Sequence, residues 1–302
     1  MLSKSSRRRR RTQATNTWGL AVLFVKTFFS TTQISALDFG LLERAASVRS
    51  KIQEYPQNTD LFYPSAYPRP DGKGMRGMCN WVIPNRLMVG QYPGQSPEPF
   101  APNSNDVQSH IQSLTKDAGI NLFCSLQSEI PAQSDKKAWE FNGGERYFPD
   151  PYVRREFPRP FKHYAPMVES FNPDVKFIHA PIDDCDVPKS DGALSDLLMD
   201  LLTAMDEEDR CIYVHCWGGR GRAGLVGACL LSLIFPEKDA ASILELIQIG
   251  YDTRAGAKNM PPGLQQSPQT QSQKDFVKLF VEERQRHHFF FKKENVVTKE
   301  LA

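Results

Sequence analysis

A glycine-rich loop lies between two apolar segments, and this arrangement restricts the folds that the chain can adopt. Residues 211–214 read Cys-Ile-Tyr-Val, a β-branched and aromatic run typical of a buried strand. Residues 225–234 are apolar and helix-forming, with Gly227 as the one helix breaker. Between them, residues 214–224 read Val-His-Cys-Trp-Gly-Gly-Arg-Gly-Arg-Ala-Gly. The sequence therefore predicts a strand, a tight loop and a helix, with a cysteine at the strand-to-helix turn.

The residue types in this loop suit an anion site that contains a nucleophile. Gly218, Gly219 and Gly221 allow consecutive backbone N–H groups to converge on one anion, and the following helix adds the positive end of its dipole. The guanidinium of Arg222, six positions after Cys216, can hold two phosphate oxygens at once. The same field favours the thiolate of Cys216, which is the nucleophilic form. We therefore predict a phosphate site in which Cys216 is the nucleophile.

The rest of the loop is predicted to support this site. His215 can orient the loop by hydrogen bonding to neighbouring backbone. A cysteine between a strand and a helix is commonly an apolar filler, which is our interpretation of Cys211 and Cys229. The predicted substrate-binding residues are Trp217, Gly218, Gly219, Arg220, Gly221 and Arg222.

The His-Cys-x5-Arg pattern resembles the signature of the cysteine-dependent protein tyrosine and dual-specificity phosphatases, over about residues 80–285. Three further segments carry the resemblance. Residues 80–93 are similar to the first strand pair of these domains, and residues 177–188 to their general-acid loop. Residues 267–277 resemble the segment whose glutamine precedes the final helix. Within the family, the sequence most resembles the phosphatases associated with cyclin-dependent-kinase inhibitors.

The resemblance implies a two-step mechanism. The thiolate of Cys216 attacks phosphorus, while Arg222 and the loop amides hold the equatorial oxygens. An aspartate protonates the leaving oxygen and then acts as base when water hydrolyses the phosphocysteine. Asp184 matches the family position of this acid. Asp183 and Asp186 are the alternatives, because adjacent carboxylates on one loop could exchange roles or simply be solvated turn residues.

Two further positions bear on turnover. Gln273 matches the family glutamine and is predicted to position the hydrolytic water, although a glutamine in a polar run can equally be an exposed side chain. The family usually carries serine or threonine after the arginine, and its hydroxyl assists departure of the thiolate. The residue here is Ala223, so the resemblance implies slow hydrolysis of the phosphocysteine. A phospho-ligand-binding pseudophosphatase is therefore an alternative, against which the presence of Cys216 and Arg222 argues.

The resemblance implies a phosphorylated protein as substrate, with dual or tyrosine specificity. Arg220 supports an alternative, because family members that act on phosphoinositides or inositol phosphates often carry a basic residue at this position. A phosphoglucan is a further alternative, since some family members that act on phosphorylated carbohydrate also carry alanine at the position of Ala223. Residues 139–171 interleave aromatic and basic side chains, which can grip a phosphorylated ligand, but such a proline-rich loop commonly packs its rings on the domain.

Strand and helix patterns alternate along the chain, which predicts an α/β fold with a mostly parallel central sheet, helices on both faces and the site at the carboxyl ends of the strands. This is also the dual-specificity-phosphatase-like fold that the resemblance implies. The predicted strands are 82–83, 87–89, 120–125, 177–182 and 211–214, and the predicted helices are 107–117, 194–205, 224–234, 240–248 and 274–285. The helix at 194–205 follows a predicted cap at Ser190 or Asp191.

Four regions are predicted: a basic targeting or disordered segment at 1–36, an extension and linker at 37–79, the catalytic domain at 80–287 and a charged, poorly ordered tail at 288–302. Within the second region, residues 38–79 are predicted to hold a short helix and then a linker rich in Pro, Gly and Tyr. The first region resembles a mitochondrial or plastid presequence, and its apolar run is far shorter than the ~20 residues of a membrane span. A secretory signal cleaved near Ala36 is the alternative. The six cysteines show no paired spacing, which favours an organelle or the cytoplasm over secretion.

The charge of the chain is distributed unevenly. The formal net charge is +2, but no acidic residue precedes Asp38 while seven basic residues do. The rest of the chain holds 30 basic against 35 acidic side chains and gives no reason to expect nucleic-acid binding. No cluster of His, Cys and carboxylates has the spacing of metal ligands, and the implied mechanism needs neither metal nor cofactor. The expected partner is therefore a phosphorylated substrate.

Overall fold

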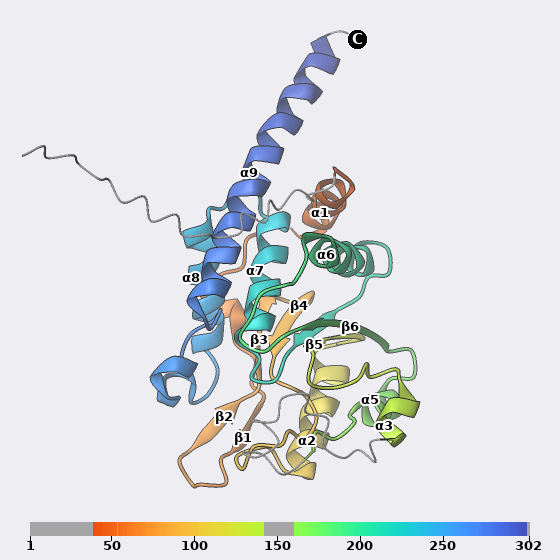
Figure 1. Cartoon of the computed structure of the whole chain (residues 1–302), viewed down its shortest axis with the longest axis vertical. Helices are drawn as coiled ribbons and strands as arrows, with labels where there is room; N and C mark the ends of the chain where they lie inside the picture. Colours follow the sequence, from red (N-terminus) through yellow and green to blue (C-terminus); the bar gives the residue numbers. More distant parts are fainter. Residues whose placement is uncertain (1–38, 53, 142–159, 301–302) are drawn as a thin grey trace, which may run out of the picture. The chain divides into compact units, whose positions relative to one another are not determined.

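A five-stranded sheet forms the centre of the computed structural model, which describes residues 39–52, 54–141 and 160–300 (Figure 1). The strand order is β3-β4-β7-β5-β6. The β3–β4 pair is antiparallel and the other three pairs are parallel, so the predicted mostly parallel sheet is confirmed. The strands are β3 (Cys79–Ile83), β4 (Leu87–Gly90), β5 (Leu122–Gln127), β6 (Lys176–Ile182) and β7 (Ile212–His215).

The central position of β7 follows from its composition. All four of its residues are buried, as expected for a strand that is covered on both faces rather than on one. Val214 pairs with Val89 on one side and with Cys124 on the other. The carboxyl end of β7 therefore emerges between two buried strands and leads directly to Cys216.

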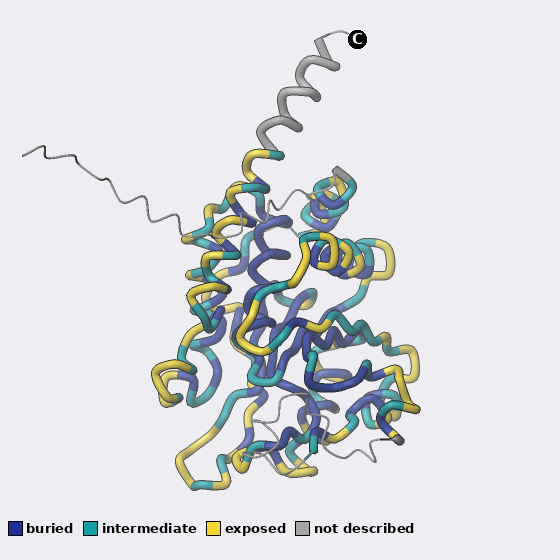
Figure 2. The backbone as a smooth tube through the Cα atoms, viewed as in Figure 1, coloured by how far each residue is buried: buried dark blue, intermediate teal, exposed yellow. Residues whose placement is uncertain are grey.

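Helices cover both faces of the sheet, as predicted. One hydrophobic core joins the sheet to α1 (Phe39–Lys51), α6 (Asp191–Asp206), α7 (Arg222–Ile234), α8 (Ala240–Asp252) and α9 (Gln271–Glu300). A second core joins the other face to α2 (Ser104–Gln112), α3 (Lys136–Phe141) and α5 (Ala165–Phe171). Every residue of α7 is buried, as is every residue of β3, β4, β5 and β7, and Figure 2 shows this buried centre in dark blue. No helix in the described ranges is long and apolar enough to cross a membrane.

Local sequence explains where several helices begin. The side chain of Asn103 accepts hydrogen bonds from the backbone N–H groups of Asn105 and Asp106, so α2 begins at Ser104, before the predicted start, and continues into a π-helical turn at Ser113–Asp117. Ser190 caps α6 in the same way, which confirms one of the two predicted caps.

The segment before the sheet begins with the short helix that the sequence predicts, α1, but the predicted linker after it holds further structure. Leu41, Ala45 and Val48 of α1 are buried in the first core, and Arg44 lies 2.9 Å from the carboxylate of Asp206 in α6. A hairpin follows, formed by β1 (Ala66–Pro68) and β2 (Met75–Gly77), and it is visible at the bottom of Figure 1. The described residues all belong to one compact unit, and the predicted boundary between extension and catalytic domain stays a prediction.

The end of the chain differs from the expectation. The sequence predicts a helix that ends near Gln285, followed by a poorly ordered tail, whereas α9 continues to Glu300. Residues 271–300 contain neither glycine nor proline, and nothing in the local sequence stops the helix. The predicted presequence, residues 1–36, lies outside the described residues.

Candidate active site

The predicted phosphate loop, residues 216–221, connects β7 to α7. Cys216 is buried, and α7 begins at Arg222, so the N–H groups of its first turn are not used within the helix. Gly219 has φ +69°, and a Cβ atom at this position would lie 2.1 Å from the backbone N of Gln91. Only glycine fits there, so the loop can lie directly against the end of β4.

Arg222 is the most constrained side chain of the loop. Its guanidinium is 1% exposed, and it donates two hydrogen bonds to Glu129, of 2.7 and 2.8 Å. It also donates to the carbonyl oxygen of Ile182 at 3.0 Å and to Oδ1 of Asp184 at 2.8 Å. Burial opposes the charged form, but Glu129, Cys216 and Asp184 offset it, so the pKa of Arg222 lies above its ordinary value. Arg222 is therefore a fixed, fully charged group beside Cys216.

Glu129 was not identified from the sequence. It lies just after β5, is only 5% exposed, and holds both terminal nitrogens of Arg222 in a bidentate pair. Its position in the sequence could have identified it as a site residue. An acidic residue that follows the carboxyl end of a predicted parallel strand lies at the edge of the sheet where the site was expected. Without this partner, the charge of Arg222 would be buried with little compensation.

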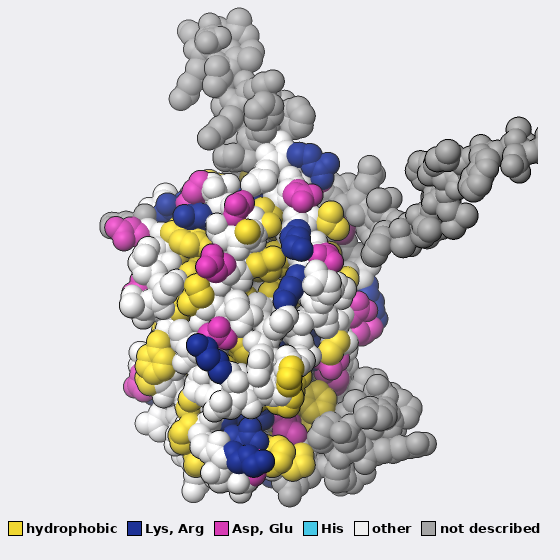
Figure 3. Space-filling view, turned by 90° about the vertical axis from the view of Figure 1, so that its left-hand side faces the viewer, with side chains coloured by type: hydrophobic (Ala, Val, Ile, Leu, Met, Phe, Trp, Pro, Cys, Tyr) yellow, Lys and Arg dark blue, Asp and Glu magenta, His cyan; other side chains and the backbone are white. Residues whose placement is uncertain are grey.

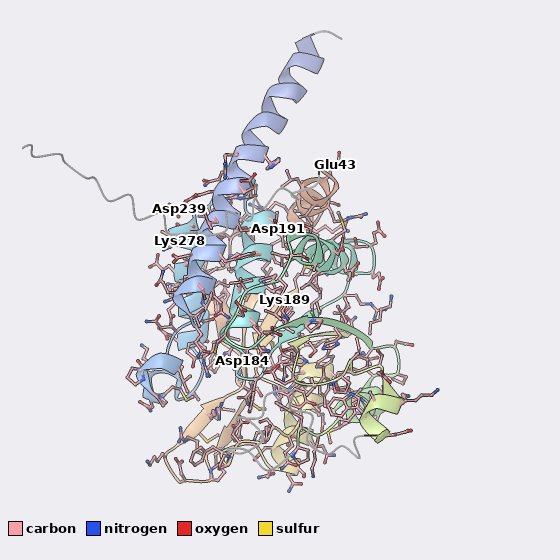
Figure 4. The ribbon with its side chains drawn as sticks, in the orientation of Figure 1. Glu43, Asp184, Lys189, Asp191, Asp239 and Lys278 are labelled. Atoms are coloured by element: carbon pink, nitrogen blue, oxygen red, sulfur yellow. The ribbon has the colours of Figure 1, made fainter. Side chains whose placement is uncertain are left out.

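Of the three candidate acids, only Asp184 contacts Arg222. The carboxylate of Asp183 lies 2.7 Å from Lys189, which lowers the pKa of Asp183 below its usual value, and Asp186 accepts the backbone N–H of Val187. Figure 4 labels Asp184 and Lys189 on the segment between β6 and α6. The side chain of Asp184 is 58% exposed, so solvent reaches its carboxylate.

Gln273 is fully buried, so the alternative of an exposed side chain is wrong. Its Oε1 accepts the N–H groups of Gln269 and Thr270, and its Nε2 donates to the carbonyl oxygen of Asp186. A Cβ atom on Gly221 would lie 3.1 Å from Oε1 of Gln273. The amide therefore connects the start of α9 to the segment that carries Asp184, immediately behind the phosphate loop. Its role with water stays a prediction.

Two buried groups lie behind the loop. His215 shares a 2.8 Å hydrogen bond with the hydroxyl of Tyr164, and burial lowers the pKa of His215 to about 3, so its ring is neutral. Arg254, which the sequence did not single out, donates to the carbonyl oxygens of Gly219 and Val89 and to Oδ1 of Asn80, at 2.8 to 2.9 Å. The described residues provide no carboxylate partner for it, and burial lowers its pKa.

The aromatic and basic segment 139–171 is described only in part. Phe161 and Tyr164 are buried, and both rings pack edge-on against Tyr92. For these two residues, the prediction that the rings of this segment pack on the domain is confirmed. Residues 142–159, which hold Tyr147, Phe148, Tyr152, Arg154, Arg155, Phe157 and Arg159, lie outside the described residues.

One cavity of about 600 Å³ brings the predicted catalytic residues Cys216, Arg222 and Asp184 together. The predicted substrate-binding residues other than Gly219 line it too, whereas Ala223 is buried in α7 and His215 lies behind the loop. Within the described ranges no cluster of His, Cys and carboxylates could hold a metal ion. The cavity is also lined by Arg69, Arg76, Glu98, Pro99, Phe100, Cys185, Met260, Pro261, Leu264 and Gln269.

Comparison with known proteins matches residues 162–283 to the family model described as PTP-SAK, the Swiss Army Knife protein DSP-PTPase phosphatase domain. A search of curated proteins found no significant match. Among solved structures, kinase associated phosphatase (KAP) is 16% identical with a TM-score of 0.44, covering 69% of this chain and 94% of that one. PTPMT1 in complex with PI(5)P is 15% identical with a TM-score of 0.36, covering 68% and 95%. The core catalytic domain of the PP-IP phosphatase SIW14 from S. cerevisiae is 12% identical with a TM-score of 0.38, covering 72% and 92%.

Proposed function

We propose that the chain hydrolyses phosphotyrosine and phosphoserine or phosphothreonine in proteins, through a phosphocysteine on Cys216. The match of residues 162–283 to the DSP-PTPase phosphatase domain supports this proposal. The observation that carries this proposal is the position of Arg222. Its guanidinium is held by Glu129 and lies in the same cavity as Cys216 and Asp184. A nucleophile, an anion clamp and an acid therefore meet in one cavity.

The first step forms a phosphorus–sulfur bond. The thiolate of Cys216 attacks phosphorus, while Arg222 and the N–H groups of the glycine-rich loop hold the three non-bridging oxygens. The bond from phosphorus to the bridging oxygen breaks, and Asp184 gives its proton to that oxygen. Before this step, the phosphate takes the place of the Asp184 carboxylate beside Arg222, which frees the acid to face the leaving group.

The second step breaks the phosphorus–sulfur bond. Asp184, now a carboxylate, takes a proton from water while the water oxygen attacks phosphorus, and Cys216 leaves as the thiolate with release of inorganic phosphate. Gln273 lies at the back of the loop and holds the backbone of Asp186, which fixes the distance between acid segment and loop. Ala223 provides no hydroxyl to assist the departing sulfur, so this step limits the rate.

A second candidate is a substrate with several phosphates, such as an inositol phosphate, a phosphoinositide or a phosphoglucan. It is favoured by the arginines of the cavity wall, Arg76 and Arg220, which are additional to Arg222.

Phosphate release from the full chain tests the proposal. The substrates are 4-nitrophenyl phosphate, a phosphotyrosine peptide and a phosphothreonine peptide, each with and without vanadate. We expect turnover of all three and inhibition by vanadate, because vanadate occupies the same oxyanion site. Turnover of inositol phosphates with neither peptide cleaved would favour the second candidate, and vanadate binding without turnover of any substrate would favour a binding module.

Asp184→Asn is expected to lower kcat for the phosphothreonine peptide by about 10²-fold, because an alkoxide leaving group needs a proton. The effect should be smaller for 4-nitrophenyl phosphate, whose leaving group is stable as an anion. Asp186→Asn and Asp183→Asn are matched controls on the same segment and should change kcat by less than about twofold. An equal or larger loss in either control would assign the acid to that residue instead.

A further inference from the structure

Arg222 brings little surplus positive charge to Cys216. Its guanidinium contacts two carboxylates, that of Glu129 at 2.7 Å and that of Asp184 at 2.8 Å. Within this group the charge of Arg222 is therefore balanced by its acidic partners. A thiolate at neutral pH depends on an excess of positive charge around it, and the N-terminus of α7 contributes only a partial charge of about +0.5. The charge balance at Cys216 therefore depends on which other cations lie close to it.

The remaining arginines that line the cavity are paired or in contact with solvent. Asp71 binds Arg69 at 2.6 Å, and Glu98 lies 3.7 Å from Arg76. Arg220 is partly exposed, so water screens its charge. On the face drawn in Figure 3, surface Lys and Arg side chains are likewise interspersed with Asp and Glu. These three arginines therefore bring no unscreened charge to the loop.

Arg254, just after α8, differs from them in both respects. It is 5% exposed, and its guanidinium donates to neutral oxygen atoms of Asn80, Val89 and Gly219. In the described part of the chain no carboxylate forms an ion pair with it. Burial lowers the pKa of Arg254, but an arginine keeps its proton in a folded protein. The fold therefore buries one full positive charge, without an acidic partner, directly against the phosphate loop.

Only one of the acidic groups close to Arg254 is suited to become its counter-ion. These groups are Tyr251, Cys79, Tyr213 and Cys216. Burial raises the pKa of Cys79 to about 12 and that of Tyr213 well above its ordinary value, so both stay neutral at pH 7. The hydroxyl of Tyr251 donates its proton to a backbone carbonyl oxygen. Cys216 is the remaining group, and it belongs to the loop that Arg254 contacts.

The other titratable groups around Cys216 do not provide this charge. Burial lowers the pKa of His215, its neighbour in the chain, to about 3, so the ring is neutral. Cys185 lines the same cavity, and burial together with Asp184 raises the pKa of its thiol. The groups that face Cys216 from β7 and from the acid segment are therefore neutral or acidic, which leaves Arg254 as the buried cation without an acidic partner.

We propose that the buried charge of Arg254 keeps Cys216 in the thiolate form, which makes Arg254 a positioning residue for the reaction. The inference rests on the proposed function. A buried guanidinium without a counter-ion is costly, and an anion close to it lowers that cost. The thiolate supplies this anion in the free protein, and the oxygens of a phosphate held by the same loop add to it when substrate binds. Burial of Arg254 and ionisation of Cys216 thus stabilise each other.

Alkylation of Cys216 by iodoacetamide, measured in the full chain as a function of pH, tests the inference. Cys185→Ser is the background, because Cys185 is exposed while the other four cysteines are buried. Arg254→Gln should raise the pH of half-maximal alkylation by about one unit, since a cation beside the thiolate is lost. Arg254→Lys keeps the charge and should restore most of this change. An unchanged pH in Arg254→Gln would overturn the inference, as would an equal rise in both variants.

Asn80→Asp gives a second test that keeps the arginine. Oδ1 of Asn80 accepts the Nε proton of Arg254 at 2.8 Å, so aspartate at this position would supply the missing carboxylate at almost the same volume. The pH of half-maximal alkylation should again rise by about one unit, because the charge of Arg254 is then balanced. No rise in this variant would count against the inference even if Arg254→Gln fails to fold.

Arg284→Gln is the matched control. Arg284 is also fully buried, and it donates to the backbone carbonyl oxygens of Pro236 and Lys238, beyond the opposite end of α7. Its loss should leave the pH of half-maximal alkylation unchanged, and a rise equal to that of Arg254→Gln would refute the inference. Alkylation needs no turnover, so the two proposals fail separately. The expected rise in a chain that releases no phosphate would contradict the proposed function alone, whereas turnover without the rise would overturn only the role of Arg254.

Discussion

Cys216→Ser is expected to lower phosphate release on the order of 10⁴-fold or more while the folded structure and oxyanion binding persist. A serine hydroxyl keeps its proton at neutral pH even in the field of Arg222 and the loop amides, so it cannot replace the thiolate. The oxygen fits the space of the sulfur, and the N–H groups of the loop are unchanged. The measurement is initial-rate phosphate release together with vanadate binding by calorimetry.

Cys185→Ser is the matched control, because Cys185 is an exposed cysteine that lines the same cavity. It should keep at least about half of the activity, since its sulfur takes no part in the bond changes. Comparable activity in Cys216→Ser and wild type would refute the phosphocysteine mechanism. Loss of activity together with loss of vanadate binding would place Cys216 in the anion site as a binding group rather than a nucleophile.

Glu129→Ala is expected to lower the free energy of unfolding by about 3–5 kcal/mol. The guanidinium of Arg222 is 1% exposed, and removal of Glu129 leaves this charge with Asp184, a half-exposed partner, and backbone carbonyl oxygens. The cost is the penalty of an uncompensated buried charge rather than the net value of the ion pair. Urea unfolding followed by circular dichroism at neutral pH measures the change.

The double variant Glu129→Ala, Arg222→Met separates this cause from a cavity effect. If the charge is responsible, removing both partners should restore most of the stability lost in Glu129→Ala, because no buried charge then remains. Glu129→Gln, which preserves the volume, should also destabilise the fold, although less than Glu129→Ala. A double variant no more stable than the single one would show that packing at position 129, and not charge, determines the loss.

The loop and the mostly parallel sheet could be predicted, because the strand, loop and helix patterns that indicate them are local. The apolar run of β7 and the small residues after Cys216 specify a strand, an anion loop and a helix within about twenty residues of sequence. Asp184 was predicted from its match to the family's general-acid loop, and it lines the cavity that also contains Cys216 and Arg222. Those patterns do not indicate which acidic side chain is buried beside the loop. Glu129 was therefore not predicted.

The short helix of the N-terminal segment was predicted, but the burial of the residues after it could not be, for another reason. The Pro, Gly and Tyr content of those residues is typical of a linker, yet Tyr67 of β1 is 1% exposed and Leu61 is fully buried. Burial there depends on the surface against which the segment lies, namely α6, α8 and the strand pair. For the charged end of α9 the prediction of a poorly ordered tail was wrong. Helix propensity alone is enough to continue the helix there.

The hydrogen bonds of Arg254 show that the catalytic loop is not a self-contained piece of sequence. Asn80 and Gly219 lie 174 and 35 residues from Arg254, yet one guanidinium group holds both, together with the carbonyl of Val89. The direction of the Gly219 carbonyl, and with it that of the next N–H group, is thus set by three remote segments. Residues 214–224, transplanted into another α/β scaffold, would carry the nucleophile and the arginine but not the backbone shape that makes them a phosphate site.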